Sequence, residues 1–276
     1  MIIYDYIYIY QSYSTSLCMD FEGRKRFILN RLEKTGTVLT QEITENCHVS
    51  EVTARRDLAY IESQGLLSRI YGGAVKSRSA DAMFSYDKIA LHNRDKKIRI
   101  SGAAASFIQD NDSIYIDCGT TVYHLSSNIR HFQNLRVITN SLPVVSELIF
   151  HAGIRIYLLG GELDNERRAV YGPMSENMIR YYRARKAFIG AGGVSLADGL
   201  STGNEKEASI TRMMAQAADT VYLLCDSSKI EKNAFVHYAP LEMIDYLITD
   251  QMAPELIKAY EKQNIKVVIP ENNNQS

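Results

Sequence analysis

The chain has 276 residues, too many for a helix-turn-helix unit alone and enough for one small and one medium-sized domain. Hydrophobic residues make up 46% of it and charged residues 23%, as is usual for a globular protein. The net charge of −1 excludes nucleic-acid binding through bulk charge, so any DNA site must come from local placement of basic residues.

The four cysteines are too far apart in the sequence to form a metal or redox motif. No two of Cys18, Cys47, Cys118 and Cys225 stand at CxxC spacing. We therefore expect no metal site, no cofactor and a reducing, cytoplasmic location. No apolar run reaches the length of about 18 residues that spans a membrane, so we expect no contact with one.

The first 18 residues differ in composition from the rest. They contain five tyrosines and no lysine or arginine, and their side chains alternate with a period of two. A signal peptide needs a basic start and an apolar centre, and both are absent. One interpretation is an exposed β-forming tail. The interpretation we favour is a start codon placed too early, with Met19 opening the native protein, so that residues 1–18 form a disordered or non-native extension.

Residues 19–76 show the pattern of a small domain. Apolar residues recur at helical spacing from Phe21 to Leu32. Residues 37–39 are expected to be extended, Thr40 to cap a short helix over 41–46, and residues 47–49 to form a turn.

The next helix begins at Ser50, a strong capping residue, and is expected to end near residue 64, just before Gly65. Ala54, Leu58 and Ile61 share one of its faces. Strands over residues 66–70 and 74–75 follow, joined through residues 71–73. These elements predict a winged helix-turn-helix domain, with the helix-turn-helix itself over residues 38–57.

The outward face of this helix carries residues suited to DNA. The second helix of a helix-turn-helix lies in the major groove with its first turns against the base edges. Arginine matches both a guanine edge and a phosphate. We expect DNA contacts from Ser50, Thr53, Arg55, Arg56 and Arg69, the last on the wing. The alternative is that Arg55 and Arg56 form a solvated helix face, with Arg56 bound to a nearby acid.

The pattern changes after residue 76. Residues 77–95 are polar and weakly patterned, and we expect a linker with some helix. Beyond it, short apolar runs alternate with helical stretches such as 142–151, 205–218 and 254–263, which predicts a mainly parallel sheet covered on both faces. We expect an α/β, Rossmann-like domain over residues 96–276. Its strands are expected at residues 114–116, 137–138, 154–159, 187–189, 221–224, 246–248 and 266–269.

Small and hydroxyl-bearing residues follow most of these strands. The first strand leads into Cys118-Gly119-Thr120-Thr121 and a helix start, where backbone N–H groups and hydroxyls can cradle an anion. In open parallel sheets, ligands bind at this carboxyl edge. The blander interpretation is that glycine and threonine merely make the turn. Similar loops follow at residues 139–141, 160–161, 190–193 and 226–229.

Residues 24–75 closely resemble the winged helix-turn-helix head of the DeoR family of bacterial transcription regulators. One departure is Ala54, where the family usually has isoleucine; losing several buried methyl groups costs about 2–4 kcal/mol if nothing refills the space. The residues that carry the resemblance are Arg24-Lys25-Arg26, Val49-Ser50, Thr53-Ala54-Arg55-Arg56-Asp57-Leu58, Glu62, Gly65-Leu66-Leu67 and Tyr71-Gly72-Gly73-Ala74.

Residues 97–250 resemble the effector domain of the same family, whose fold is akin to ribose-5-phosphate isomerase and glucosamine-6-phosphate deaminase. The motifs are IDCGTT, ITNSLP, LLGGEL, YGPM, AFIGAGGV, DGLSTGNEKE, LLCDSSK and LITD. Cys118 stands where serine is frequent. The resemblance implies a phosphorylated sugar as effector, with its phosphate on Gly119, Thr120 and Thr121. The other expected effector-binding residues are Asp117, Asn140, Ser141, Gly160, Gly161, Glu207 and Lys229.

The hypothesis we favour is a repressor of a sugar-metabolism operon whose binding to double-stranded operator DNA is modulated by a phosphorylated sugar. It would not be an enzyme, and it would be a homodimer or homotetramer, because palindromic half-sites pair with symmetric proteins. The alternative is an active sugar-phosphate isomerase or deaminase with a vestigial head, using Asp117, Glu207 or Lys229 as its base. A third interpretation is a redox sensor built on Cys118.

Overall fold

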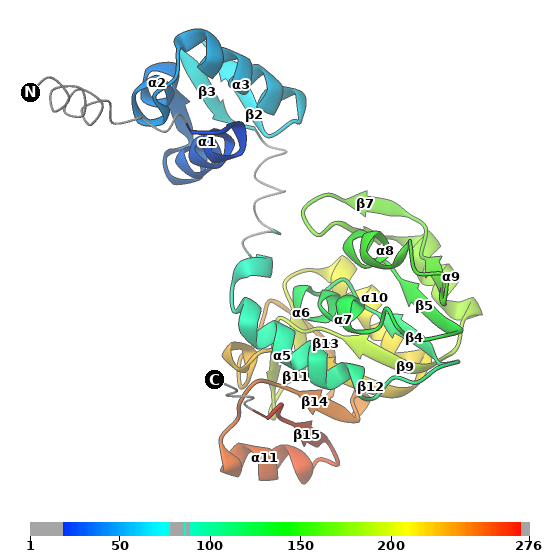
Figure 1. Cartoon of the computed structure of the whole chain (residues 1–276). Coiled ribbons are helices and arrows are strands. Elements are labelled where there is room, and N and C mark those ends of the chain that lie inside the picture. The colour runs from blue at the N-terminus through cyan, green and yellow to red at the C-terminus, as the bar shows by residue number, and fades with distance from the viewer. Residues whose placement is uncertain (1–18, 78–85, 87–88, 272–276) are drawn as a thin grey trace, which may run out of the picture. The chain divides into compact units, whose positions relative to one another are not determined.

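The computed structural model describes residues 19–77, 86 and 89–271 (Figure 1). The chain forms two compact units, Met1–Phe84 and Ser85–Ser276, each with hydrophobic clusters of its own. Residues 1–18, 78–85 and 87–88 lie outside the described residues, and so do the predictions made for them, namely the N-terminal extension and most of the linker.

The first unit has the predicted winged helix-turn-helix form. Its strands pair antiparallel in the order β1-β3-β2, so that β2 and β3 make the wing. The elements described are α1 (Phe21–Thr35), β1 (Thr37–Leu39), α2 (Thr40–Cys47), α3 (Glu51–Ser63), β2 (Leu67–Ile70) and β3 (Gly73–Lys76).

The limits of α3 are those that the sequence predicts. The Ser50 side chain accepts a hydrogen bond from the backbone N–H of Thr53, and Gly65 has a φ of +73°, which suits glycine just past a helix end. The predicted cap of α2 is wrong by one residue. Leu39 holds the cap position and donates its N–H to Glu42, whereas Thr40 lies inside the helix and donates its N–H to Gly72 O in the wing turn.

Helix α1 is fastened to α3 by a buried ion pair. Arg24 donates from Nε to Asp57 Oδ2 at 2.6 Å and from Nη2 to Asp57 Oδ1 at 3.2 Å. The two side chains are 10% and 3% exposed, so the pair is screened little by solvent. Around it, Ala54, Leu58 and Ile61 face the core of the unit, as their spacing predicts.

The second unit is built on a parallel sheet. Within the described residues it has seven strands in the order β15-β14-β12-β9-β4-β5-β6, and each contains or overlaps one predicted apolar run. Their bounds are β4 (Ser113–Ile116), β5 (Leu135–Thr139), β6 (Ile154–Leu158), β9 (Ala184–Ile189), β12 (Ala218–Leu224), β14 (Tyr246–Ile248) and β15 (Lys266–Val268).

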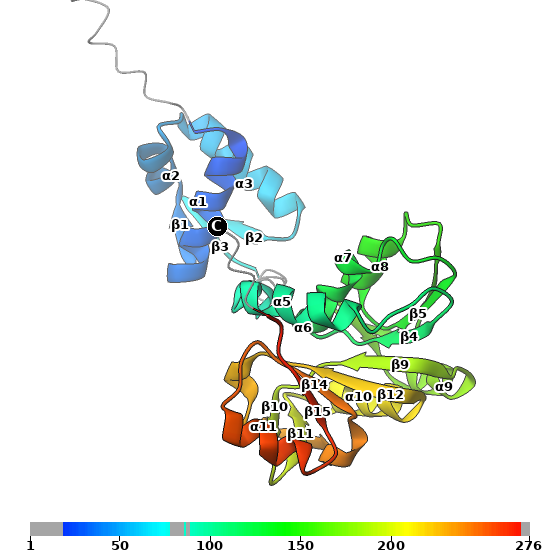
Figure 2. The same ribbon diagram turned by 60° about the horizontal axis from the view of Figure 1, so that its bottom comes forward.

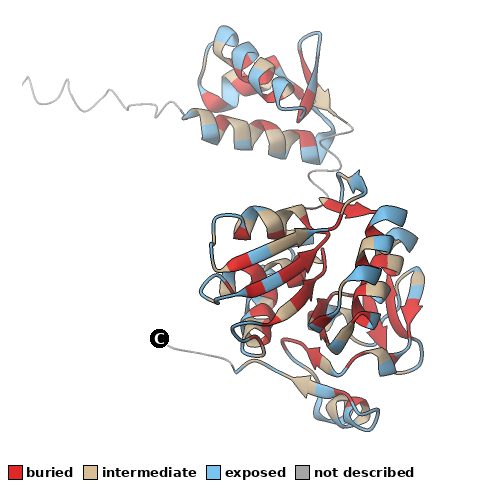
Figure 3. Ribbon diagram, turned by 90° about the vertical axis from the view of Figure 1, so that its right-hand side faces the viewer, coloured by how far each residue is buried: buried red, intermediate tan, exposed pale blue. Residues whose placement is uncertain are grey.

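Helices cover both faces of this sheet, and alternate residues of each strand enter opposite clusters (Figures 2 and 3). In β4, Ile114 and Ile116 face one cluster and Tyr115 the other. On the side of Ile114 lie α5 (Arg94–Ala105), α6 (Thr120–Tyr123), α7 (Leu125–Asn128) and α8 (Leu142–Leu148). On the side of Tyr115 lie α9 (Pro173–Tyr181), α10 (Glu205–Gln216) and α11 (Pro254–Glu261).

The chain changes direction within the sheet between β4 and β9. Strands β4, β5 and β6 follow one another toward one edge, and β9, β12, β14 and β15 follow one another toward the other. The carboxyl ends of β4 and β9 therefore flank a topological switch point, which is where open α/β sheets bind ligands.

The second unit also contains short antiparallel strands outside this sheet. These strands were not predicted. They are too brief for their side-chain periodicity to be recognised in the sequence. Strands β7 (Glu162–Asp164) and β8 (Ala169–Tyr171) form a hairpin, and β10 (Gly193–Ser195), β11 (Gly199–Thr202) and β13 (Val236–Ala239) form a small sheet. The 3-10 helices are η1 (Ser227–Lys229) and η2 (Leu241–Met243).

The buried pair predicts a large stability effect in the first unit. Arg24→Met leaves the Asp57 carboxylate buried without its partner, which costs about 3–5 kcal/mol. We expect amide hydrogen exchange in α3 to accelerate by roughly 100-fold or more in the full chain, because each 1.4 kcal/mol is a factor of ten.

The matched control is Arg31→Met. Arg31 pairs with Glu42 at 2.5 Å, but these side chains are 42% and 28% exposed. Such a pair contributes about 1 kcal/mol or less. Equal acceleration of exchange in the two variants would show that the buried Arg24–Asp57 pair stabilises the first unit no more than the exposed Arg31–Glu42 pair does.

Candidate functional sites

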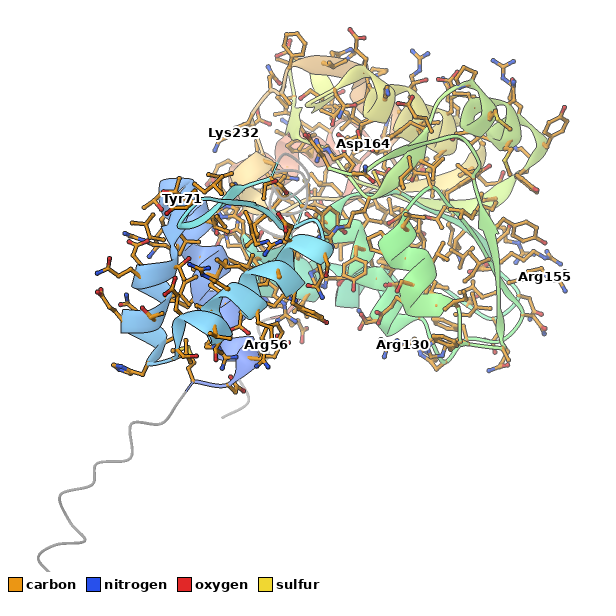
Figure 4. The ribbon with its side chains drawn as sticks, turned by 90° about the horizontal axis from the view of Figure 1, so that it is seen from above. Arg56, Tyr71, Arg130, Arg155, Asp164 and Lys232 are labelled. Atoms are coloured by element: carbon orange, nitrogen blue, oxygen red, sulfur yellow. The ribbon has the colours of Figure 1, made fainter. Side chains whose placement is uncertain are left out.

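The predicted DNA-contact residues lie on the outer side of α3 and on the wing. Ser50 and Thr53 sit at the start of α3, with their hydroxyl oxygens 3.0 Å apart. Arg55 donates to Glu51 Oε1 at 2.5 Å across one helical turn, and both side chains are more than half exposed. Arg56 is also exposed, and Figure 4 shows it at the surface of the unit.

The wing is tied to α3 through Arg69. Arg69 donates its Nε to Glu62 Oε2 at 2.6 Å and its backbone N–H to Glu62 Oε1 at 2.8 Å. These two hydrogen bonds lower the pKa of Glu62. Arg69 and Arg55 line one hollow of about 500 Å³ between helix and wing, so the structure brings these two predicted residues together.

Two exposed apolar side chains of the first unit were not predicted as DNA contacts. Val52, on the first turn of α3, is 78% exposed, and Tyr71, at the wing turn, is fully exposed (Figure 4). An exposed valine at a recognition-helix start can contact a thymine methyl group. The signal in the sequence was an apolar residue on the otherwise polar side of the helix.

A cavity lies at the switch point of the second unit. Its volume is about 80 Å³, enough for several water-sized groups, and it is called here the switch-point cavity. Loops after β4, β9 and β12 and the start of α10 line it. Five predicted effector residues meet there, namely Gly119, Thr120, Thr121, Glu207 and Lys229.

Two further groups in the lining of the switch-point cavity, Tyr86 and Arg167, were not predicted. The Gly190–Gly192 segment also lines it and belongs to one of the loops expected at the strand ends. Arg167 comes from the β7–β8 turn, and its Nη2 lies 3.0 Å from Glu207 Oε2. Lys229 donates from Nζ to Ala191 O at 2.8 Å.

Lys97, on α5, lies directly behind the cavity wall. Its Nζ donates to Thr120 Oγ1 at 2.9 Å and to Ile89 O, and the residue is 2% exposed. Across residues 19–77, 86 and 89–271 no carboxylate forms an ion pair with it. Burial, and then the charge of Lys229, lower the pKa of Lys97 to about 8 against the opposing effect of Asp226.

Asp117 is buried behind the cavity rather than on its wall. Its Oδ1 accepts from the Cys118 N–H at 2.8 Å and the Thr211 hydroxyl at 3.3 Å, and its Oδ2 accepts from the Gly190 N–H at 3.1 Å. These bonds fasten the ends of β4 and β9 to α10. Burial, and secondarily the Glu207 carboxylate, raise the pKa of Asp117 to about 6.

Four other predicted effector residues lie outside the lining of the switch-point cavity. Asn140 donates from Nδ2 to Val170 O at 3.3 Å, and Ser141 caps α8. Gly160 O accepts from the Ser175 hydroxyl. At Gly161, whose φ is +148°, an added Cβ would meet Tyr171 O at 2.3 Å. All four therefore support the base of the β7–β8 hairpin, and their contact with an effector stays a prediction.

The thiol of Cys118 is in an unreactive setting. It is 4% exposed and lies 3.2 Å from the Tyr171 hydroxyl. Burial, followed by the Asp117 and Glu207 carboxylates, raises the pKa of Cys118 well above its usual value. Because redox-active cysteines are exposed and low in pKa, this setting disfavours the redox-sensor interpretation.

No set of three or more His, Cys, Asp or Glu residues in the described ranges could hold a metal ion. No helix in that part of the chain is long and apolar enough to cross a membrane.

Comparison with known proteins gives matches over most of the chain. The family model of the DeoR-like helix-turn-helix domain matches residues 24–80, and that of the DeoR C terminal sensor domain matches residues 92–251. The chain is 38% identical to the lactose phosphotransferase system repressor of Staphylococcus epidermidis, over 81% of this chain and 89% of that protein. It is 36% identical to the HTH-type transcriptional repressor GlcR of Bacillus subtilis, over 84% and 89%.

Among solved structures, a D-ribose-5-phosphate isomerase in complex with phospho-erythronic acid is 17% identical. The alignment covers 50% of this chain and 54% of that chain, with a TM-score of 0.38.

The contacts of Asp117 predict how its proton affinity responds to Glu207. We expect Glu207→Gln to lower the pKa of Asp117 from about 6, because a neighbouring negative charge is removed. Carbon NMR of selectively labelled aspartate between pH 4 and 8 would measure it. Glu205→Gln, an exposed change on the same helix, should leave the pKa of Asp117 unchanged; an equal shift in both variants would contradict the assignment.

Proposed function

The chain belongs to the DeoR family, and we propose that it is a transcriptional repressor of a sugar-metabolism operon whose operator binding is modulated by a phosphorylated sugar. The observation that carries the effector part of this proposal is Lys97. This buried lysine has no carboxylate partner among the described residues, and its ammonium group donates to a hydroxyl of the switch-point cavity wall. Buried charges are normally paired, so this cation calls for an anion.

The rest of the switch-point cavity supports an anionic ligand that also carries hydroxyl groups. Thr121 Oγ1 is buried and has no hydrogen-bond partner among the described residues. Gly119 lets the backbone approach closely, and Lys229 adds a second ammonium group. At the other end, Arg167 and Glu207 present a donor and an acceptor that suit sugar hydroxyls. These groups suit a ligand whose phosphate lies beside Lys97 and whose sugar lies beside Glu207.

The surface of the first unit supports DNA binding. Arg55 and Arg69 flank one hollow, and each is held by a carboxylate on α3. Exposed pairs of this kind contribute about 0–1 kcal/mol, so a phosphate or a guanine edge can displace the carboxylate at little cost. The free N–H groups at the start of α3 suit a phosphate as well.

The relatives support the repressor part of the proposal, because both are named repressors and one is named for the lactose phosphotransferase system. We propose in addition that the chain acts in the cytoplasm as a homodimer or homotetramer, since a two-fold protein matches two half-sites of a palindromic operator.

The DNA-binding face is tested at Arg55. A duplex selected from a random-sequence library by the wild-type protein serves as the operator. We expect Arg55→Ala to weaken binding to that duplex by roughly 5- to 150-fold, because one bidentate arginine–guanine contact is worth about 1–3 kcal/mol. Fluorescence anisotropy measures the affinity, and circular dichroism verifies that the fold is retained.

The control for this experiment is Arg31→Ala, which removes an arginine of α1 paired with Glu42. It should change operator affinity less than twofold, within the scatter of a non-contacting charge. Wild-type affinity in Arg55→Ala would show that the recognition face is placed wrongly.

The switch-point cavity is tested through the pH dependence of ligand binding. The pKa of Lys97 is about 8, below the usual value for lysine, and a bound phosphate would raise it. Ligand binding then takes up a proton above pH 8. We expect the dissociation constant to rise by up to about tenfold per pH unit between pH 8 and 9.5 and to stay flat from pH 7 to 8.

The probe is whichever member of a panel of pentose 5-phosphates and hexose 6-phosphates binds most tightly in calorimetry. Lys97→Met should bind it weakly and without this rise. A wild-type affinity that stays constant to pH 9.5 would argue against a phosphate beside Lys97. Robust turnover of these sugar phosphates together with failure to bind any duplex would overturn the repressor proposal itself.

A further inference from the structure

The turn of the β7–β8 hairpin contains two consecutive arginines, Arg167 and Arg168, whose side chains contact different residues. Strands β7 and β8 pair antiparallel, and residues 165–168 connect them. Arg167 reaches Glu207, and the guanidinium of Arg168 lies over the ring of Tyr86, 4.6 Å from its centroid. Arg168 has a φ of +50°, a left-handed conformation that is uncommon for a long side chain and marks a functional constraint.

Arg167 is the residue of this turn that lines the switch-point cavity. Its guanidinium is part of the cavity lining, 31% exposed, with the Glu207 side chain 14% exposed. Burial opposes the charge of Arg167, but Glu207 together with smaller contributions from Cys118, Tyr171 and Asp164 outweighs this effect and raises the pKa of Arg167. A ligand with acceptor oxygens would therefore meet a permanently charged donor that is already bound to a movable carboxylate.

The Arg168 side of the turn holds the chain where it enters the second unit. Tyr86 is 6% exposed and lies in sequence just after residues 77–85, which follow the last strand of the wing. An arginine over an aromatic ring contributes stabilisation without fixing the ring as a hydrogen bond would. Tyr86 is also part of the cavity lining.

The base of the hairpin is anchored, so that movement is confined to its turn. Val170 donates its N–H to Asn140 O, and Leu142 donates its N–H to Arg168 O, both at 2.9 Å. Gly161 leaves no space for a side chain against Tyr171. These contacts hold the Arg168 carbonyl and the start of β8, and they do not include residues 165–167 at the tip of the turn.

We propose that the Arg167–Arg168 turn couples ligand binding in the switch-point cavity to the chain segment at Tyr86, and so to operator affinity. This rests on the proposed function. A ligand that draws Arg167 away from Glu207 reorients residues 165–167 next to the anchored Arg168 carbonyl, and this turns the Arg168 side chain off the Tyr86 ring. The stacked and unstacked arrangements are the two states whose populations the ligand changes. Tyr86 and Arg168 are then positioning residues of the response, distinct from the groups that hold the ligand.

The experiment measures the coupling factor, which is the operator dissociation constant with saturating sugar phosphate divided by that without it. Saturation removes any effect of a variant on ligand affinity. The sugar phosphate is the tightest-binding member of the pentose and hexose phosphate panel, and the operator is the duplex selected by the wild-type protein. Calorimetry confirms for each variant that the ligand binds and at what concentration it saturates.

We expect a wild-type factor of about 5- to 150-fold and a factor below about twofold in Tyr86→Leu and Arg168→Met. Tyr86→Phe keeps the ring and should retain the wild-type factor, which a role of the Tyr86 hydroxyl in hydrogen bonding would not predict. Tyr181→Leu removes a highly exposed tyrosine of α9 and should leave the factor unchanged. Without ligand, Tyr86→Phe and Tyr181→Leu should bind the operator as wild type does, whereas Tyr86→Leu and Arg168→Met should bind it with the affinity of ligand-saturated wild type, because they cannot form the stacked arrangement.

Two failures are distinguishable. If Tyr86→Leu binds the sugar phosphate and keeps the wild-type coupling factor, the turn is not the coupling element, while the repressor function stands. If no member of the panel binds the wild-type protein or changes its operator affinity, the proposed function fails and this inference fails with it.

Discussion

The carboxylate of Asp117 accepts hydrogen bonds from the end of β4, the end of β9 and helix α10, and the switch-point cavity depends on this one group. Strands β4 and β9 pair in the sheet but are distant in the sequence, and the Asp117 carboxylate extends this connection beyond the strand ends to the loops that form the cavity walls. The connection is made in a buried place, where an unpaired carboxylate would be costly and one with three donors is well satisfied. The raised pKa of Asp117 reflects its burial away from water.

The chemistry of the switch-point cavity depends on which of the charged groups around it are already paired. Asp117 is occupied by backbone and hydroxyl donors, and Glu207 by Arg167, so neither neutralises the buried ammonium of Lys97. Within the part of the chain that the structure describes, Lys97 is thus a cation in a low-dielectric position that no carboxylate pairs with. Such an arrangement is unfavourable for folding, as the lowered pKa of Lys97 indicates, and becomes favourable once an anion enters. A strained charge of this kind is typical of a binding site rather than of a structural core.

The two units use ion pairs in opposite ways. In the first unit the Arg24–Asp57 pair is buried and bidentate and holds helices together, whereas the Arg55 and Arg69 pairs are exposed and easily exchanged for another anion. The same residue type is structural in one place and available for recognition in the other, and burial decides which. In the second unit Arg167 lies between these extremes, partly buried yet paired with a single carboxylate, which suits a group that changes partners.

Much of this molecule could be predicted from local patterns. The seven parallel strands, the limits of α3 from Ser50 to Gly65, and the loop at Gly119 all depend on periodicity, capping or turn chemistry, which act over a few neighbouring residues. Predictions failed where the outcome depends on distant segments. Thr40 was expected to cap a helix, but its N–H belongs to the wing turn.

The roles of the effector residues divide in the same way. Whether a loop residue faces the cavity is set by strand order, because only the ends of β4, β9 and β12 converge at the switch point, while Asn140 and Gly160 follow the strands beyond it. Lys97 and Arg167 reach the site from a helix and a short hairpin that leave no periodic signal at that spot. By itself the sequence determined the elements and the family, because these are written in local patterns. Only the tertiary structure decided which charges are buried together and which are left exposed, because burial and pairing arise from the packing of segments that are remote along the chain.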